Sequence, residues 1–138
     1  MSCQTNFACG PSVAYGNLAC GNTPTYVQDQ LCTDLNIIPT TTGLFATDIY
    51  RSNLNPARLY VSGFISITGA PVGRTITVNF RIGGPAGTII ETDTILPGTS
   101  LAFNKTGFDT IELVVGAGED LTPNVTGQLC VTSRYAVS

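Results

Sequence analysis

The sequence contains no histidine and no tryptophan, and only 11% of its 138 residues are charged. Without histidine, Ser-His-Asp and Cys-His catalysis are excluded, and the commonest general base is missing. The lack of tryptophan also disfavours a carbohydrate-binding or sugar-hydrolysing sandwich, the weakest of the alternatives. We therefore expect the protein to be no enzyme and to hold no cofactor.

Other absences limit the partners and the route of export. The net charge is −3 and basic clusters are lacking, which argues against nucleic acid and against an anionic membrane surface. No run of apolar residues is long enough to insert into a membrane. The start of the chain also lacks the basic and apolar regions of a secretory signal peptide. We expect a protein that leaves the cell by another route.

Cysteine is what the chain does have, in an odd number of five. If all five oxidise, at least one must bond outside its own chain or stay free. There is no CxxC pair, so a zinc site is disfavoured and we expect no metal. Buried structural thiols remain a simpler alternative. Cys3, Cys9 and Cys20 lie within the first 28 residues, which carry no charged side chain.

The composition divides the chain into an arm and a domain. A neutral leader rich in Gly, Asn, Ser and Thr cannot bury enough apolar surface to fold alone, so residues 1–20 are expected to form a flexible N-terminal connector arm. Residues 21–138 contain short runs of Val, Ile, Thr, Phe and Tyr separated by Gly, Pro and Asn. This spacing predicts an all-β, eight-stranded jelly-roll β-sandwich. The expected strands are Tyr26–Cys32, Gly43–Arg51, Arg58–Thr68, Arg74–Ile82, Thr88–Ile95, Ser100–Phe103, Thr110–Val115 and Gly127–Val137.

Alternation along the strands predicts which side chains face the core. Ile76, Val78, Phe80 and Ile82 share one face of their strand, and Leu59, Val61, Ile65 and Ile67 form a second inward row, with Gly63 as a bulge or a point of close approach.

The same alternation places one cysteine on an outer face. In the last strand Leu129, Val131, Tyr135 and Val137 point one way, whereas Cys130 lies in the opposite, polar row. Cys32 falls in the more polar row of the first strand, although Asp29 in the other row blurs that assignment. An outward thiol is a poor core filler and a good acceptor for a cross-link.

A cysteine-bearing arm, an eight-strand β-domain and a last strand reading Gln-Leu-Cys-Val-Thr-Ser-Arg-Tyr resemble the endospore appendage (Ena) pilins of spore-forming bacteria. The resemblance implies a jelly-roll subunit that assembles with copies of itself into fibres on the spore surface, outside the cell. Subunits of that family associate laterally through their sheets, and their N-terminal connectors form disulfides with cysteines on the strands of neighbours.

Carried over to this sequence, the resemblance makes Cys3 and Cys9 connector cysteines and Cys130 the acceptor of the last strand. Cys20 and Cys32 have no certain counterpart: they either bond each other within a subunit, or Cys32 serves as a second acceptor. Five residues separate Cys3 from Cys9, whereas some members have adjacent connector cysteines. This favours the type built from stacked, linked rings over the staggered helical type. The main alternative function is a non-fibrous oligomeric jelly-roll module of a spore coat, capsid or phage-tail accessory.

Overall fold

A computed structural model describes residues 25–137, and within them the predicted all-β fold is confirmed. Eight strands are present, and a single turn of 3-10 helix, η2 (Pro56–Arg58), precedes the third strand. The strands are β1 (Tyr26–Ile37), β2 (Phe45–Arg51), β3 (Leu59–Gly69), β4 (Ile76–Ile82), β5 (Thr88–Ile95), β6 (Thr99–Thr106), β7 (Thr110–Val115) and β8 (Val125–Ala136). The predicted connector, residues 1–20, lies outside the described residues.

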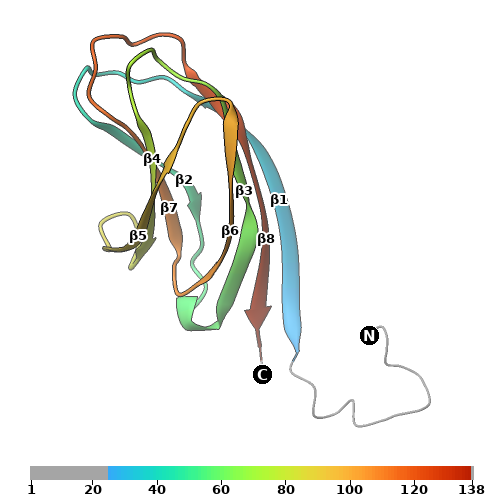
Figure 1. Ribbon diagram of the computed structural model, residues 1–138. Coiled ribbons are helices and arrows are strands. Elements are labelled where there is room, and N and C mark those ends of the chain that lie inside the picture. Colours follow the sequence, from blue (N-terminus) through green and yellow to red (C-terminus); the bar gives the residue numbers. More distant parts are fainter. Residues whose placement is uncertain (1–24, 138) are drawn as a thin grey trace.

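The strands form two antiparallel four-stranded sheets that face each other (Figure 1). One sheet has the order β1-β8-β3-β6 and the other the order β2-β7-β4-β5. In this order the first and last strands are neighbours and consecutive strands mostly lie in opposite sheets, as in a jelly roll. The connections after β1, β3, β5 and β7 meet at one end of the sandwich, and β1 begins at the other end, where β8 finishes.

The first strand is five residues longer than the sequence predicts. The extension contains Asp34 and Asn36, residue types that are depleted in strands, which is why the pattern appears to stop at Cys32. Pairing with β8 along the whole length, from Tyr26 opposite Ala136 to Ile37 opposite Val125, holds these residues in the sheet. Tertiary pairing therefore overrides a weak local preference.

The core between the sheets contains the predicted inward rows. Leu59, Val61, Ile65 and Ile67 of β3 are buried, as are Ile76, Val78 and Phe80 of β4. Phe80 packs edge-to-face against Phe103 and Phe108, an arrangement that aromatic rings favour. Ile82 and Val137, also predicted to face inward, are exposed because they lie at or beyond the ends of their strands.

One buried polar side chain departs from the alternation. Asn79 lies in the outer row of β4 and yet is only 9% exposed. It donates to Glu112 and accepts from Thr92 on the two neighbouring strands, and Glu112 also forms an ion pair with Arg81. This network covers Asn79 on the outer face of the second sheet and supplies the hydrogen-bond partners that a buried polar side chain needs. Asn79 is therefore buried outside the core.

A buried arginine ties three of the loops together at the end of the sandwich where the connections meet. Arg74, which precedes β4, is 4% exposed. Its guanidinium donates to the carbonyl oxygens of Gly116 (2.7 Å), Asp120 (3.0 Å) and Gly43 (2.8 Å). A side chain at Gly118 would overlap the Arg74 stem, since its Cβ would lie 2.4 Å from Arg74 Cγ. One side chain thus replaces regular secondary structure in satisfying loop carbonyls.

We expect Arg74→Met to lower the free energy of unfolding by about 2 kcal/mol or more, because three carbonyl oxygens lose their donor. Urea unfolding followed by circular dichroism measures the change. The matched control is Arg58→Met, at an exposed arginine of η2, which should shift the free energy by less than about 0.5 kcal/mol. Equal effects at the two positions would contradict the role given to Arg74.

Candidate functional site

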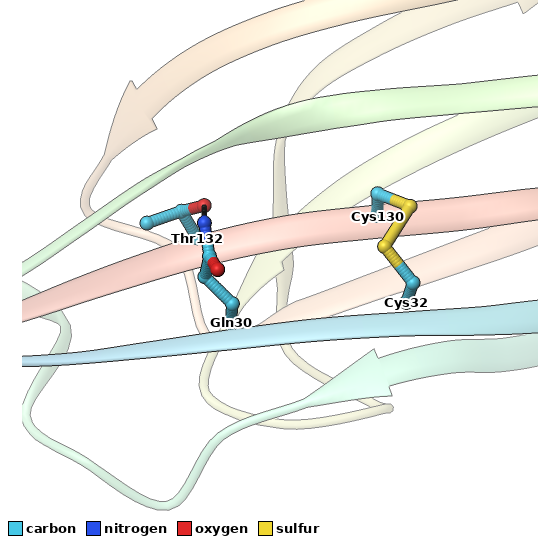
Figure 2. Close-up of a disulfide and its surroundings, with 4 residues drawn as sticks. All are labelled: Gln30, Cys32, Cys130 and Thr132. Atoms are coloured by element: carbon cyan, nitrogen blue, oxygen red, sulfur yellow. Dashed lines mark hydrogen bonds between the residues drawn. A yellow bond between two sulfur atoms is a disulfide. The ribbon is translucent and has the colours of Figure 1, made fainter.

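The first and last strands bring two of the five cysteines together. In the antiparallel pairing of β1 with β8, Cys32 lies directly opposite Cys130, with Leu31 opposite Val131 on one side and Thr33 opposite Leu129 on the other. The Cα atoms of Cys32 and Cys130 are 4.1 Å apart, close to the spacing of a non-hydrogen-bonded pair, in which side chains approach most closely. The two sulfur atoms form a disulfide (Figure 2).

The disulfide is one step in a row of cross-strand pairs on the outer face of the sheet. Gln30 donates to Thr132 (3.4 Å) and Arg134 donates to Gln28 (2.9 Å). Cys130 lies in the row with Thr132 and Arg134, while the neighbouring Leu129 and Val131 are buried in the core. The outward orientation of Cys130 predicted from alternation therefore agrees with the burial of its neighbours.

A shallow hollow of about 230 Å³ adjoins the disulfide. It is lined by Gln30, Cys32, Gly63, Phe64, Cys130, Val131 and Thr132. The lining carries no charged side chain. Phe64 on β3 is opposite Cys130, so Cys130 lies between Cys32 and Phe64 across the sheet.

Gly63 allows the strands beside this hollow to approach closely. A Cβ at this position would lie 2.0 Å from the carbonyl oxygen of Cys130, a distance that no side chain tolerates. The register of β3 with β8 is continuous through Gly63 and shifts only between Ile67 and Gly69. Of the two readings of Gly63 from sequence, the structure therefore supports close approach and not a bulge.

The half of β1 that carries Cys32 is exposed on both faces. Val27 and Leu31 lie in the inward row, yet they are 51% and 49% exposed, whereas Leu35 further along the same row is 7% exposed. β1 is an edge strand of its sheet, so one side of its backbone has no strand partner in the described part of the chain. Tyr26–Cys32 thus presents an unpaired backbone edge together with apolar side chains.

Tyr50 of β2 is partly buried against the core, near this part of β1. Its hydroxyl bonds to Ser133 on β8 and to Ser52, and Asp29 of β1 lies close enough to act on it. Burial is the main cause that raises the pKa of Tyr50, and the negative charge of Asp29 adds to it. The phenol therefore stays neutral and packs between the sheets.

The opposite edge of the sandwich is closed by charges. Lys105 of β6 pairs with Glu91 of β5, and its ammonium lies 4.9 Å from the centre of the Phe80 ring. The hydrogen bond from Lys105 lowers the pKa of Glu91, whereas burial and then the nearby Glu91 raise the pKa of Asp93. On an edge strand, charged side chains that point inward discourage pairing with another chain. The two edges therefore differ in what they offer to a partner.

Of the cysteines singled out from the sequence, the structure places Cys32 and Cys130 together, and Cys3, Cys9 and Cys20 lie outside the described residues. From the sequence we expect Cys32 to bond Cys20 or another subunit; its bond to Cys130 is a third arrangement. Phe64 and Thr132 beside the disulfide were missed, although the outward row of β3 that contains Phe64 was a signal.

Two other kinds of site were sought among residues 25–137. No group of three or more His, Cys, Asp or Glu side chains is placed to hold a metal ion. No helix in this part of the chain is long and apolar enough to cross a membrane.

The fold is that of a jelly-roll β-sandwich protein with a disulfide on its outer face and an uncovered edge strand. A model of the endospore appendage family matches residues 16–137. A solved structure from Bacillus endospore appendages, described as a family of disulfide-linked pili, is 31% identical with a TM-score of 0.66, covering 88% of this chain and 99% of that one.

The chain belongs to the endospore appendage family. It is a structural protein and not an enzyme, as the missing histidine predicts, and the family implies a location on the spore surface. A structure of infectious bursal disease virus, Gt strain, is 13% identical with a TM-score of 0.48, covering 82% of this chain and 32% of that one. That similarity is too distant to bear on function. Among curated proteins, none matched this chain.

The strand disulfide is expected to stabilise the folded protein. It joins residues 98 apart in the sequence, and a cross-link over a loop of that length restricts the unfolded chain strongly. We expect Cys130→Ser to lower the free energy of unfolding by about 2–4 kcal/mol in oxidising buffer, measured by guanidinium unfolding.

Reductant should lower the stability of the wild type by a similar amount and leave Cys130→Ser nearly unchanged. The control is Gln128→Ser, on the same strand and face, which keeps both cysteines. A Cys130→Ser variant as stable as this control would contradict the prediction.

Proposed function

We propose that this protein is a self-assembling subunit of a fibre on the endospore surface, held to neighbouring copies by disulfides between its arm and their strands. The observation that supports this most is the similarity to the disulfide-linked pilus structure, which extends over 88% of this chain at 31% identity. The fibre and its cross-links are stated in the description of that relative and are inferred for this chain.

The distribution of cysteines fits such a linkage. Cys3 and Cys9 lie in the neutral leader, where a folded core is not expected to enclose them, and Cys130 and Cys32 lie on the surface of the domain. A segment of about 20 residues spans at most roughly 65–70 Å when extended, which is enough to reach another subunit. In this proposal the leader supplies the connector cysteines, Cys130 and Cys32 are the acceptors, and Cys20 has no assigned partner.

Covalent links between copies would give the fibre kinetic resistance to heat and denaturant, because subunits leave only when a bond is cleaved. Such bonds persist in an oxidising setting, which a spore surface exposed by lysis of the mother cell provides. The spacing of Cys3 and Cys9 leads us to favour stacked rings joined by connectors over a staggered helix.

Lateral contacts between copies are expected along β1. The stretch Tyr26–Cys32 has no proline or lysine and only one charge, Asp29, so it lacks most of the features that protect an edge strand from pairing. Its exposed Val27 and Leu31 would be covered by a neighbouring sheet. The edge formed by β5 and β6, with Glu91 and Lys105, is less suited to such a contact.

The cross-links can be tested by removing the connector thiols. We expect wild-type protein assembled in air to form fibres in electron micrographs and to stay at the top of a denaturing gel unless reductant is added. In the double variant Cys3→Ser/Cys9→Ser the β-domain should remain folded, but heating in detergent without reductant should release monomers.

A matched control changes Ser2 and Ser12 of the same leader to alanine and should behave as the wild type. A small discrete oligomer of constant size in oxidising and reducing buffer would contradict the fibre and support the non-fibrous jelly-roll module. If the Cys3→Ser/Cys9→Ser protein remains covalently linked, the assignment of the connector cysteines is wrong.

The lateral contact can be tested at Leu31. Leu31→Lys places a charge on the exposed half of β1, and we expect the protein concentration needed for assembly to rise at least about tenfold, because burying an unpaired charge is costly. Sedimentation after assembly measures this concentration. Leu54→Lys, the same change at an exposed leucine outside the strands, is the control, and an equal shift for both variants would argue against β1 as the contact.

A further inference from the structure

The strand disulfide raises a question about how a link between copies forms. Cys32 and Cys130 are bonded to each other, so neither carries a thiol that could be oxidised together with a connector thiol. The three remaining cysteines all lie in the first 20 residues. A link to either strand cysteine must therefore begin by breaking the bond between them.

The bond is accessible to a thiol from another chain. Cys32 is exposed and belongs to the edge strand, and the hollow beside it reaches both cysteines. Phe64 and Thr132 border this hollow. In Figure 2 the two sulfur atoms bridge β1 and β8 one step along the row from the pair Gln30–Thr132.

The surroundings also suit a thiolate on its approach. The residues that line the hollow are all uncharged, so no carboxylate there repels the incoming sulfur. The connector arm that would carry the thiol is also uncharged, since residues 1–28 contain no charged side chain. An uncharged segment of this kind, with abundant amide and hydroxyl groups, brings no charge into the neutral hollow other than that of the attacking thiolate itself. The occupant that fits is therefore the leader of a second copy.

We propose that the Cys32–Cys130 disulfide is the electrophile for cross-linking, attacked through the hollow by a connector thiolate of another copy. This inference rests on the proposed function. The Cys3 or Cys9 thiolate forms a new disulfide with one strand sulfur, the strand disulfide breaks, and the released strand thiolate takes a proton from water. One thiol is consumed and one is set free, so this step needs no oxidant.

The exchange is tested with two full-length variants mixed without oxygen. The donor carries Cys32→Ser and Cys130→Ser and has its connector thiols reduced, with the reductant then removed. The acceptor carries Cys3→Ser, Cys9→Ser and Cys20→Ser and keeps its strand disulfide. We expect donor–acceptor dimers on a non-reducing gel and one new strand thiol per link, counted by mass spectrometry after alkylation. An acceptor that also carries Cys130→Ser has only the Cys32 thiol and should form no link.

The role of the hollow is tested by two matched changes in the acceptor. Thr132 and Gln128 flank Cys130 on the same face of β8, but only Thr132 lines the hollow. We expect Thr132→Phe to slow exchange at least tenfold and Gln128→Phe to leave it within twofold, with the strand disulfide intact in both by mass. If both variants react alike, the hollow is not the route of attack and this part of the proposal is overturned.

The outcomes separate this inference from the proposed function. If no dimer forms without oxygen, but a reduced acceptor couples to the donor once an oxidant is added, exchange is overturned while arm-to-strand linkage survives. If the two chains couple under neither condition, both exchange and the proposed covalent linkage fail. Dimers that form with the release of one strand thiol per link support both the exchange and the proposed covalent linkage.

Discussion

The pairing of β1 with β8 is the contact on which the rest of the structure depends. It joins the first strand to the last, so the order of both sheets follows from it, and it sets Cys32 opposite Cys130. Few local contacts help to form it, because its partners are about a hundred residues apart, and a contact of this kind carries a large loop-closure cost. Once formed, the disulfide restricts the unfolded chain and so lowers this closure cost, which helps to keep in place a strand without full cover from the facing sheet.

Much of this arrangement was readable from residue patterns. Runs rich in Val, Ile and Thr between Gly and Pro gave eight strands, and the burial of Leu129 and Val131 on either side of Cys130 is what alternation requires. Register between distant strands was not readable, since the period of two shows which face a cysteine occupies but not which residue lies across from it. That is why Cys130 was placed on the outer face while its bond to Cys32 was missed. Arg74 was missed for a related reason: its three carbonyl partners come from loops that meet only in the folded protein.

The two edges of the sandwich show how a protein with few charges can limit where it associates. Lys105, Glu91 and Asp93 gather at the β5–β6 edge, whereas Val27 and Leu31 are left uncovered on β1. With a weakly charged surface elsewhere, a difference of a few side chains would be enough, in the proposed assembly, to direct contacts to one edge. The exposed half of β1 also carries Cys32, so the surface open to lateral contact and the site open to covalent chemistry are neighbours on one strand.

The direction of β1 has a mechanical consequence. The leader joins β1 at Tyr26, and β1 runs antiparallel to β8 along twelve consecutive register pairs, from Tyr26 opposite Ala136 to Ile37 opposite Val125. Tension transmitted through the leader along the strand would load the hydrogen bonds of this ladder together, in shear, instead of opening them one after another from an end. Rupture would then require many bonds to fail at once, so a strand that is poorly covered by the facing sheet is anchored in the geometry that best bears a pull along its axis.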